Sequence, residues 1–295
     1  MSGACDVQLI HGSPSYTLLD TGNGERLERV GTITVRRPDP NVLWPITDSY
    51  KAQWQGAQAR YLGDKEQPWI LEDQALLEGW NVSYPEVKLV VHARPTPFRH
   101  LGYFPEQYEN WCWLRDELTT LISQGVKKPR VLNLFGYTGA ASIVAAQAGA
   151  EVVHVDASKP AIAAARRNSE LSGKDLPVRW IVEDAMKFLA REERRGSTYD
   201  IILLDPPVFG RGTKGEIWRL EQGLSELLRA VVAVSAKGKV PKILLNFYAT
   251  QLYPGSVKRV LQDQLPEGTP ISLLSVELEE ESRKVGLQTG FILRT

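Results

Sequence analysis

Residues 131–139, Val131-Leu-Asn-Leu-Phe-Gly-Tyr-Thr-Gly139, carry the strongest indication of the fold. The segment begins as a short apolar run and ends in a loop with two glycines, and an alanine-rich stretch follows over residues 140–148. A short apolar run that ends at glycine is typical of a buried strand, and alanine favours a helix. We expect the glycines to let a ligand approach the backbone and Thr138 to cap the helix.

The same alternation of strand and helix continues to residue 293. Strands are predicted for residues 131–135, 151–155, 178–182, 201–204, 242–247, 272–277 and 288–293. Helices are predicted for residues 106–123, 140–148, 161–171, 185–193, 216–236 and 256–265. Apolar strands separated by helices predict an α/β fold, with a Rossmann-like, seven-stranded parallel sheet that is covered on both faces. Such sheets bind ligands at the carboxyl ends of their strands.

Residues 1–97 have a different sequence pattern. Residues 1–97 hold four of the eight tryptophans and short alternating runs such as Thr32-Ile-Thr-Val-Arg36. These patterns predict a small, mostly β domain over residues 1–97, followed by the α/β domain over residues 98–295. The tryptophans suit either a packed core or a surface for stacking bases, and core packing is the more common role.

The charge balance limits the classes of partner. The 295 residues contain 35 Lys and Arg and 35 Asp and Glu, so the whole protein has no general attraction for nucleic acid or anionic membrane. The first 120 residues carry 11 basic against 16 acidic side chains, and the rest carry 24 against 19. A surface for a polyanion is therefore expected as a local patch in the second part.

The cysteine content and the N-terminus indicate the cellular compartment. Only Cys5 and Cys112 are present, which disfavours a disulfide framework, a zinc site or an iron–sulfur site, so no metal is expected. Residues 1–14 lack the basic and apolar segments of a signal peptide. The longest uncharged stretch, residues 131–150, contains polar residues and two different periodicities, so we predict no membrane span. The sequence predicts a cytoplasmic protein.

Acidic residues follow the second and third strands. Asp156 ends the second strand about 20 residues after the glycine loop, where a carboxylate can accept hydrogen bonds from ribose hydroxyls. Asp156 could instead cap the helix that follows, but Ser158 is the better candidate for that cap, so the ribose contact is the favoured role for Asp156. Asp184 follows the third strand and opens a helix. Capping explains Asp184 fully, and the same carboxylate is also suited to the exocyclic amine of adenine.

The fourth strand ends in Asp205-Pro206-Pro207. Consecutive prolines fix the backbone and remove N–H donors, so they should form a rigid loop that aims the Asp205 carboxylate and the loop carbonyl groups at one point. Phe209 is close enough in sequence to stack on a planar ring held there. Residues 210–215, which include Arg211 and Lys214, are suited to gripping phosphate, to forming a mobile lid or to being a solvated turn.

In this order, these strand-end residues resemble the class I S-adenosylmethionine-dependent methyltransferases. The closest likeness is to the bacterial large-subunit ribosomal RNA methyltransferase group, over residues 98–250. Four motifs carry it: Val131 to Gly139, Val155-Asp-Ala-Ser158, Ala164-Ala-Arg-Arg-Asn168 and Asp205-Pro-Pro-Val-Phe209.

The resemblance implies S-adenosylmethionine as cofactor, ribosomal RNA processing as the setting and the following roles. The methionine end of the cofactor would contact Phe135, Gly136, Tyr137, Thr138 and Gly139. The ribose would contact Asp156, with Ala157 and Ser158 beside the adenosine, and the adenine would face Asp184 and Ala185. The methyl group and the target atom would face Asp205, Pro206 and Pro207, with Phe209 nearby.

Two departures from the group bear on the target atom. Val208 stands where amino-methylating enzymes usually have an aromatic residue directly after the prolines. Neither cysteine lies in a strand-end loop, which disfavours cysteine-dependent attack at cytosine C5. The leading interpretation is an RNA-base methyltransferase. The alternatives are a methyltransferase acting on a protein or small molecule, and a nucleoside-binding regulatory protein, which the Asp-Pro-Pro motif disfavours.

Overall fold

The computed structural model describes residues 6–64, 66–211, 217–238, 240–248 and 252–295, which form two compact units. The larger unit contains residues 6–8, 110–276 and 289–295, and the smaller unit contains residues 9–109 and 277–288. The predicted boundary between residues 97 and 98 therefore lies twelve residues from the observed one at 109/110. Residues 277–288, which we assigned to the α/β domain, belong to the smaller unit.

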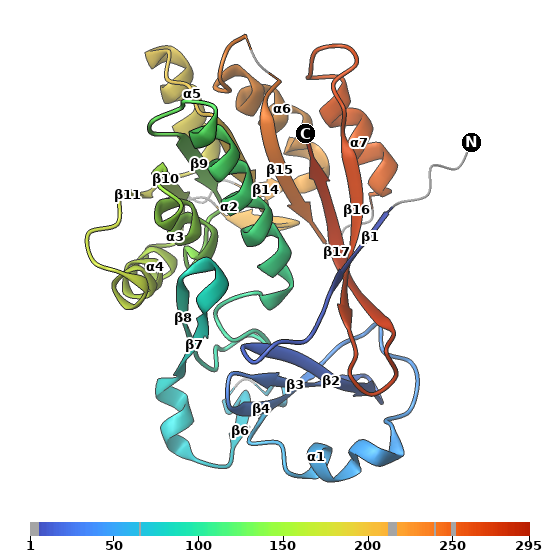
Figure 1. Cartoon of the computed structure of the whole chain (residues 1–295). Helices are drawn as coiled ribbons and strands as arrows, with labels where there is room; N and C mark the ends of the chain where they lie inside the picture. The colour runs from blue at the N-terminus through green and yellow to red at the C-terminus, as the bar shows by residue number, and fades with distance from the viewer. Residues whose placement is uncertain (1–5, 65, 212–216, 239, 249–251) are drawn as a thin grey trace. The chain divides into compact units, whose positions relative to one another are not determined.

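The large sheet has eight strands in the order β1-β16-β17-β15-β12-β9-β10-β11 (Figure 1). Their bounds are β1 Asp6–Ile10, β9 Arg130–Leu134, β10 Glu151–Asp156, β11 Val178–Val182, β12 Ile201–Leu204, β15 Lys242–Phe247, β16 Ser272–Glu279 and β17 Gly286–Arg294. The seven predicted strands are all present, and β1 is an eighth that the prediction missed. Strands β11, β10, β9, β12 and β15 are parallel neighbours, but β17 is antiparallel to β15, so the prediction of a parallel sheet is wrong for β17.

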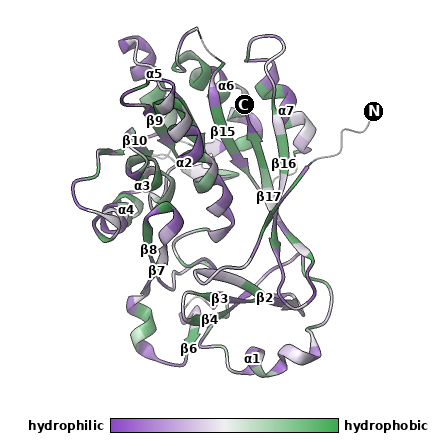
Figure 2. Ribbon diagram, in the orientation of Figure 1, coloured by the Kyte–Doolittle hydropathy of each residue, from purple (hydrophilic) through white to green (hydrophobic). Residues whose placement is uncertain are grey.

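The sheet is covered on both faces, as predicted. The helices are α2 Tyr108–Ser123, α3 Ala140–Gln147, α4 Lys159–Ser172, α5 Ala185–Arg195, α6 Leu220–Ala233 and α7 Pro254–Gln262. Side chains alternate along β9: Leu132 and Leu134 join the core formed with α5, α6 and α7, whereas Asn133 donates to Ser142 of α3. The central strands carry the hydrophobic colour along much of their length (Figure 2).

One predicted helix begins later than expected. We placed a helix over residues 216–236, but α6 begins at Leu220. Residues Ile217–Arg219 form β14, which pairs antiparallel with β13, Phe209–Arg211. The two three-residue strands are too short to show a period-2 pattern, so only the pairing reveals them. Lys214 and most of the loop it belongs to, residues 212–216, lie outside the described residues.

The smaller unit is built on a five-stranded sheet in the order β2-β3-β4-β5-β6 and a separate hairpin, β7-β8. The strands are β2 Tyr16–Gly22, β3 Glu25–Val30, β4 Ile33–Pro38, β5 Ala59–Tyr61, β6 Trp69–Leu71, β7 Trp80–Tyr84 and β8 Leu89–Ala93, and α1 covers Lys51–Gln55. This agrees with the predicted mostly β character of the N-terminal region.

Two of the four tryptophans of this unit lie in its interior. Trp54 and Trp69 are buried, and Trp54 packs with Leu19 and Leu27. Each of the four indole N–H groups donates a hydrogen bond within the unit, including those of the partly exposed Trp44 and Trp80. Buried indoles normally satisfy their N–H in this way, so the structure favours the core role over a base-stacking surface.

Candidate functional site

The glycine loop after β9 has an unusual backbone. Phe135, Tyr137 and Gly139 have positive φ angles of 57°, 50° and 85°. The left-handed conformation costs a residue other than glycine on the order of 1 kcal/mol, and such strain persists where the surrounding structure enforces it. Phe135, Gly136 and Tyr137 are partly exposed, whereas Thr138 and Gly139 are buried. The first three residues therefore form the part of the loop that a ligand can reach.

The glycines of this loop are required by packing inside the protein. A Cβ at Gly136 would lie 2.4 Å from the His154 ring, and one at Gly139 would lie 2.9 Å from Ala165. The prediction that Thr138 is the N-cap of α3 is wrong, because Gly139 occupies that position. The Thr138 carbonyl instead accepts a hydrogen bond of 2.9 Å from Asn168 Nδ2.

His154 lies beneath the loop, is fully buried and contacts Ser142 through a 2.9 Å hydrogen bond at Nδ1. Burial lowers the pKa of His154 from 6.5 to about 3, so the ring is neutral in the folded protein at neutral pH. The neutral, enclosed ring supports the glycine loop from below and is not placed to act on a ligand.

Stability should therefore depend on pH through His154. Below pH 6.5 the unfolded chain takes up a proton at His154, whereas the folded protein does so only near pH 3. The unfolding free energy should fall as pH falls through this window, by at most about 1.4 kcal/mol per pH unit for one group. Urea titrations from pH 7 to pH 4 should show a shallower slope for His154→Asn than for the wild type. Equal slopes would contradict the assignment.

Asp156 lies at the end of β10 and ties two loops together. Its Oδ2 accepts from the Tyr137 backbone N–H at 2.9 Å, and its Oδ1 accepts from the Ser158 N–H at 2.8 Å. Burial raises the pKa of Asp156, and these two hydrogen bonds oppose that rise. Each oxygen keeps a further acceptor position, and the residue is only partly buried. The carboxylate is thus held between the glycine loop and the loop before α4, where a hydroxyl could bind.

The cap roles predicted for Ser158 and Asp184 are confirmed. Ser158 accepts from Ala161 N at 3.3 Å at the start of α4, and Asp184 accepts from Lys187 N at 3.0 Å at the start of α5. Ala185 is buried in the core below α5. Its methyl group therefore packs inside the protein rather than lining an open site.

Two substitutions separate capping by Asp184 from its predicted adenine contact. Asp184→Ala should lower the unfolding free energy by about 1 kcal/mol, because the cap is lost. Asp184→Ser should restore most of that stability, since serine also caps, but its shorter side chain should not restore any contact with a nucleoside. Thermal unfolding measures the first effect, and titration with the nucleoside ligand measures the second. Equal ligand affinity in all three proteins would confine Asp184 to capping.

Asp205 follows β12 and is held by a residue that the sequence analysis missed. Asn246 Nδ2 donates to Asp205 Oδ1 at 2.8 Å. Asn246 is buried and lies on β15, the parallel neighbour of β12, so its amide is a fixed donor. Because the two residues are 41 positions apart, only the strand pairing brings them together. The signal in the sequence was a single polar residue inside an apolar strand.

The proline loop differs from expectation in one respect. We expected the carbonyl groups of the loop to point freely toward the site, but the Pro207 oxygen accepts a 2.7 Å hydrogen bond from Trp218 Nε1. Pro206 is buried and Pro207 is partly exposed. Trp218 also lies beside Phe135, with ring centres 5.9 Å apart. Trp218 therefore contacts both the proline loop and the glycine loop.

Phe209 begins β13 and is half exposed. The guanidinium carbon of Arg219, its partner on β14, lies 5.5 Å from the centre of the Phe209 ring. Cys112, on α2, is partly buried, and Cys5 lies outside the described residues. No group of His, Cys, Asp and Glu among the described residues is arranged to hold a metal ion.

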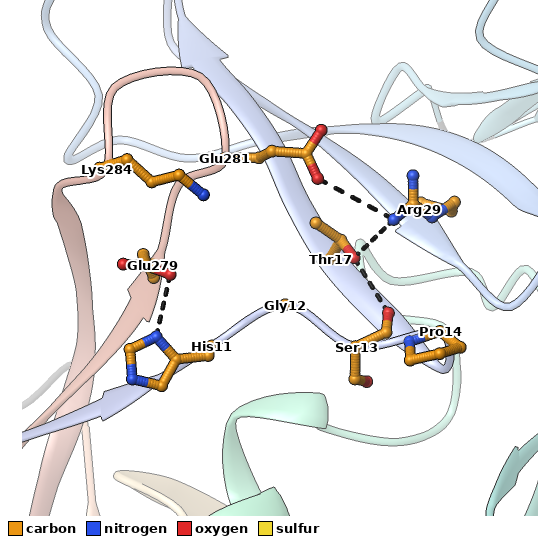
Figure 3. A pocket seen from close by; sticks show the side chains of 9 residues that line it. All are labelled: His11, Gly12, Ser13, Pro14, Thr17, Arg29, Glu279, Glu281 and Lys284. Carbon is orange, nitrogen blue, oxygen red and sulfur yellow. Dashed lines mark hydrogen bonds and ion pairs between the residues drawn. The ribbon is translucent and has the colours of Figure 1, made fainter.

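A cavity of about 360 Å³ lies in the smaller unit and contains none of the predicted site residues (Figure 3). Two side-chain pairs line it: His11 Nδ1 is 2.9 Å from Glu279, and Arg29 is 4.0 Å from Glu281. Because none of the strand-end residues lines this cavity, the strand-end cluster remains the candidate site. No helix in the described ranges is both long and apolar enough to cross a membrane.

Known proteins are similar to this chain in fold and in sequence. A family model described as "Conserved hypothetical protein 95" matches residues 113–250. The crystal structure of a SAM-dependent methyltransferase from Agrobacterium tumefaciens is 38% identical, with a TM-score of 0.90, over 100% of this chain and 96% of that one. A putative methyltransferase complexed with SAH has the same fold at 17% identity and a TM-score of 0.68, over 96% of this chain and 76% of that one.

The chain is also similar to the ribosomal RNA large subunit methyltransferase I of Aeromonas salmonicida, at 29% identity over 238 residues. That match covers 79% of this chain and 57% of the relative, so the chain spans about half the length of this group of relatives. The 38% identity along nearly the whole length of the Agrobacterium protein settles the family. The chain belongs to the class I S-adenosylmethionine-dependent methyltransferases.

Proposed function

We propose that this methyltransferase modifies a base of RNA, with ribosomal RNA as the first candidate. The observation that carries the proposal is the Asp205 carboxylate, fixed by Asn246 at 2.8 Å beside a rigid proline loop. A fixed acceptor at this edge of the sheet is suited to orienting an amine or the edge of a planar base. Relatives of about twice the matched length are named as methyltransferases of large-subunit ribosomal RNA, which supports RNA as the substrate class.

The strand-end residues fit S-adenosylmethionine. Its ribose hydroxyls and adenine amine are hydrogen-bond donors, and the ends of the adjacent strands β10 and β11 offer the carboxylates of Asp156 and Asp184. We assign the ribose to Asp156, the adenine to Asp184 and the methionine end to the exposed part of the glycine loop, Phe135 to Tyr137. When bound, the cofactor supplies a methyl group on a sulfonium.

Asp205 orients the target group in this scheme. If the target is an amine, the carboxylate accepts an N–H and turns the nitrogen lone pair toward the methyl group. The Pro207 carbonyl already accepts from Trp218, so we do not assign it a contact with the target. Proximity and orientation supply most of the rate enhancement in such a displacement. The nitrogen that takes the methyl group would also take the positive charge from the sulfur and would then release an N–H proton to water. We assign no general base.

The target base must leave any helix it belongs to. A base stacked in a duplex does not reach a strand-end pocket unless it is flipped out, and an unpaired base avoids that cost. Phe209 is the aromatic side chain nearest the proline loop in sequence, and we propose that it flanks the entering base. The near-zero net charge of the protein confines favourable phosphate contacts to local groups such as Arg219.

The test is transfer of labelled methyl from S-adenosylmethionine to separated RNA, protein and small-metabolite fractions, with wild type beside Asp205→Ala. Label in RNA that is lost in Asp205→Ala is the expected result, and nucleoside digestion then identifies the atom. Assembling ribosomal particles are included as substrate, since a large-subunit enzyme can require them. Label only in protein or in metabolites would overturn RNA as the substrate but would still show that the protein is a methyltransferase.

A further inference from the structure

The hairpin β13–β14 has two chemically different faces. Its residue pairs are Phe209 with Arg219, Gly210 with Trp218, and Arg211 with Ile217. Directly opposed residues in an antiparallel pair project to the same side, and successive pairs alternate between sides. Trp218 and Gly210 therefore share one face, and Phe209, Ile217 and Arg219 share the other. We call the second set the outer face.

Trp218 fixes the orientation of the hairpin. Its indole N–H donates to Pro207 at 2.7 Å, and its ring lies 5.9 Å from the ring of Phe135. A Cβ at Gly223 would come within 2.4 Å of the indole, so the first turns of α6 accept the ring only because residue 223 is glycine. Since the Trp218 side of the hairpin packs on the protein, the outer face is turned away from it.

The outer face is accessible and carries the side chains that suit an unpaired nucleotide. Ile217 is 66% exposed and Phe209 is 50% exposed, and Arg219 is exposed with its guanidinium over the Phe209 ring at 5.5 Å. Aromatic rings stack with bases of any sequence, and a planar guanidinium can both stack and pair with phosphate. The outer face therefore presents an exposed ring, an exposed guanidinium and an exposed aliphatic side chain to a ligand.

We propose that the outer face binds an unpaired segment of RNA next to the target base. The proposal rests on the proposed function and extends it, because it names single-stranded RNA as the form of substrate that is recognised. Phe209 follows Asp205 by four residues, so a nucleotide on this face neighbours the base held at the proline loop. Bases in a duplex hide their faces from such a ring, so the surface selects unpaired strands.

The test measures binding of a fluorescein-labelled single-stranded RNA, and of the same RNA annealed to its complement, by anisotropy in the presence of S-adenosylhomocysteine. Phe209→Ala and Arg219→Ala should each weaken single-strand binding by about 5- to 100-fold, since one stacked base contributes about 1–3 kcal/mol. Phe209→Tyr should restore affinity, because a ring is kept. Arg219→Ala should also lower the salt slope of binding by about one.

A matched control is Arg259→Ala, which removes an exposed arginine of α7 that is paired with Asp263 at 2.9 Å. This variant should bind single-stranded RNA like the wild type. Wild-type affinity in Phe209→Ala and Arg219→Ala, or an equal loss in Arg259→Ala, would overturn the proposal. An equal loss for the duplex would also overturn it, because that result indicates backbone contacts alone.

Methyl transfer to RNA by the wild type is measured beside the binding assay, so that the two proposals fail separately. If the wild type methylates RNA and the variants bind RNA as tightly as the wild type, the RNA-binding role of the outer face is refuted and the proposed function stands. Absence of RNA methylation, with binding that depends on Phe209 and Arg219, would refute the proposed function and keep the outer face as an RNA-binding surface.

Discussion

Replacement of Asp205 by alanine is expected to lower kcat for methyl transfer by about 10²- to 10³-fold, with little change in affinity for S-adenosylhomocysteine. The reason is geometric. Asp205 Oδ1 is held at 2.8 Å by the buried amide of Asn246, and its loop is stiffened by Pro206 and Pro207. Removing the acceptor leaves the target free to turn away from the methyl group, which affects turnover more than cofactor binding.

Asn246→Ala tests whether orientation is the cause. The variant keeps the Asp205 carboxylate but removes the donor that holds it, so kcat should fall by about tenfold to a hundredfold, less than in Asp205→Ala. Single-turnover assays on the methylated substrate identified by the fraction assay measure both effects. Isothermal titration with S-adenosylhomocysteine measures the cofactor site independently.

Asp200→Ala provides the matched control. Asp200 precedes β12, so it lies at the opposite end of the strand from Asp205, and it accepts a hydrogen bond from the Arg130 N–H at 2.8 Å. Loss of this aspartate should lower stability by about 1 kcal/mol and leave the kcat of the folded protein unchanged. Turnover of Asp205→Ala within threefold of the wild type would show that the carboxylate has no part in transfer.

Replacement of Glu28 by alanine is expected to lower the unfolding free energy by about 3–5 kcal/mol. Glu28 is fully buried in the smaller unit and forms two hydrogen bonds with Arg37, at 2.6 and 2.7 Å, and one with the Tyr16 hydroxyl at 2.8 Å. Arg26 lies 3.7 Å away. The substitution would leave two buried guanidinium groups without their shared carboxylate.

Two further substitutions serve as controls for the loss of stability in Glu28→Ala: Glu28→Gln, and Asp48→Ala in an exposed ion pair. Glu28→Gln keeps the shape but removes the charge, so it should destabilise by less than alanine and by more than about 1 kcal/mol. Asp48→Ala removes a carboxylate that pairs with Lys51 at the surface, where side-chain exposures are 91% and 60%, and should leave stability almost unchanged. Urea denaturation followed by tryptophan fluorescence measures all three, and equal values for Glu28→Ala and Asp48→Ala would contradict the buried cluster.

The Glu28 cluster should also control the acid limit of stability. Burial alone raises the pKa of Glu28, but Arg26, Arg37 and the hydrogen bonds lower it more, from 4.5 to about 2. The folded-state pKa is below the unfolded one, so the stabilisation is present above pH 4.5 and is lost as pH falls toward 2. Glu28→Gln should lack this part of the acid transition.

Local sequence patterns predicted the large sheet closely. The bounds expected for three strands, 178–182, 201–204 and 242–247, agree with β11, β12 and β15, because each is a short apolar or β-branched run that ends at a turn residue. The positions of Asp156, Asp184 and Asp205 at strand ends could also be predicted from the local sequence. In parallel sheets the residue after a strand lies at the ligand-binding edge, so position in the sequence predicts position in space.

The tertiary structure decided the contacts between distant segments. Asn246 became a partner of Asp205, and Trp218 a partner of Pro207, only through strand pairing and packing. The eighth strand β1, the hairpin β13–β14 and the transfer of residues 277–288 to the smaller unit were likewise invisible in the sequence. Thus the sequence by itself determined the order of strands and helices and the acidic strand ends, since these depend on neighbouring residues. The hydrogen bonds that orient those acids depend on residues tens of positions away, which only the folded chain brings together.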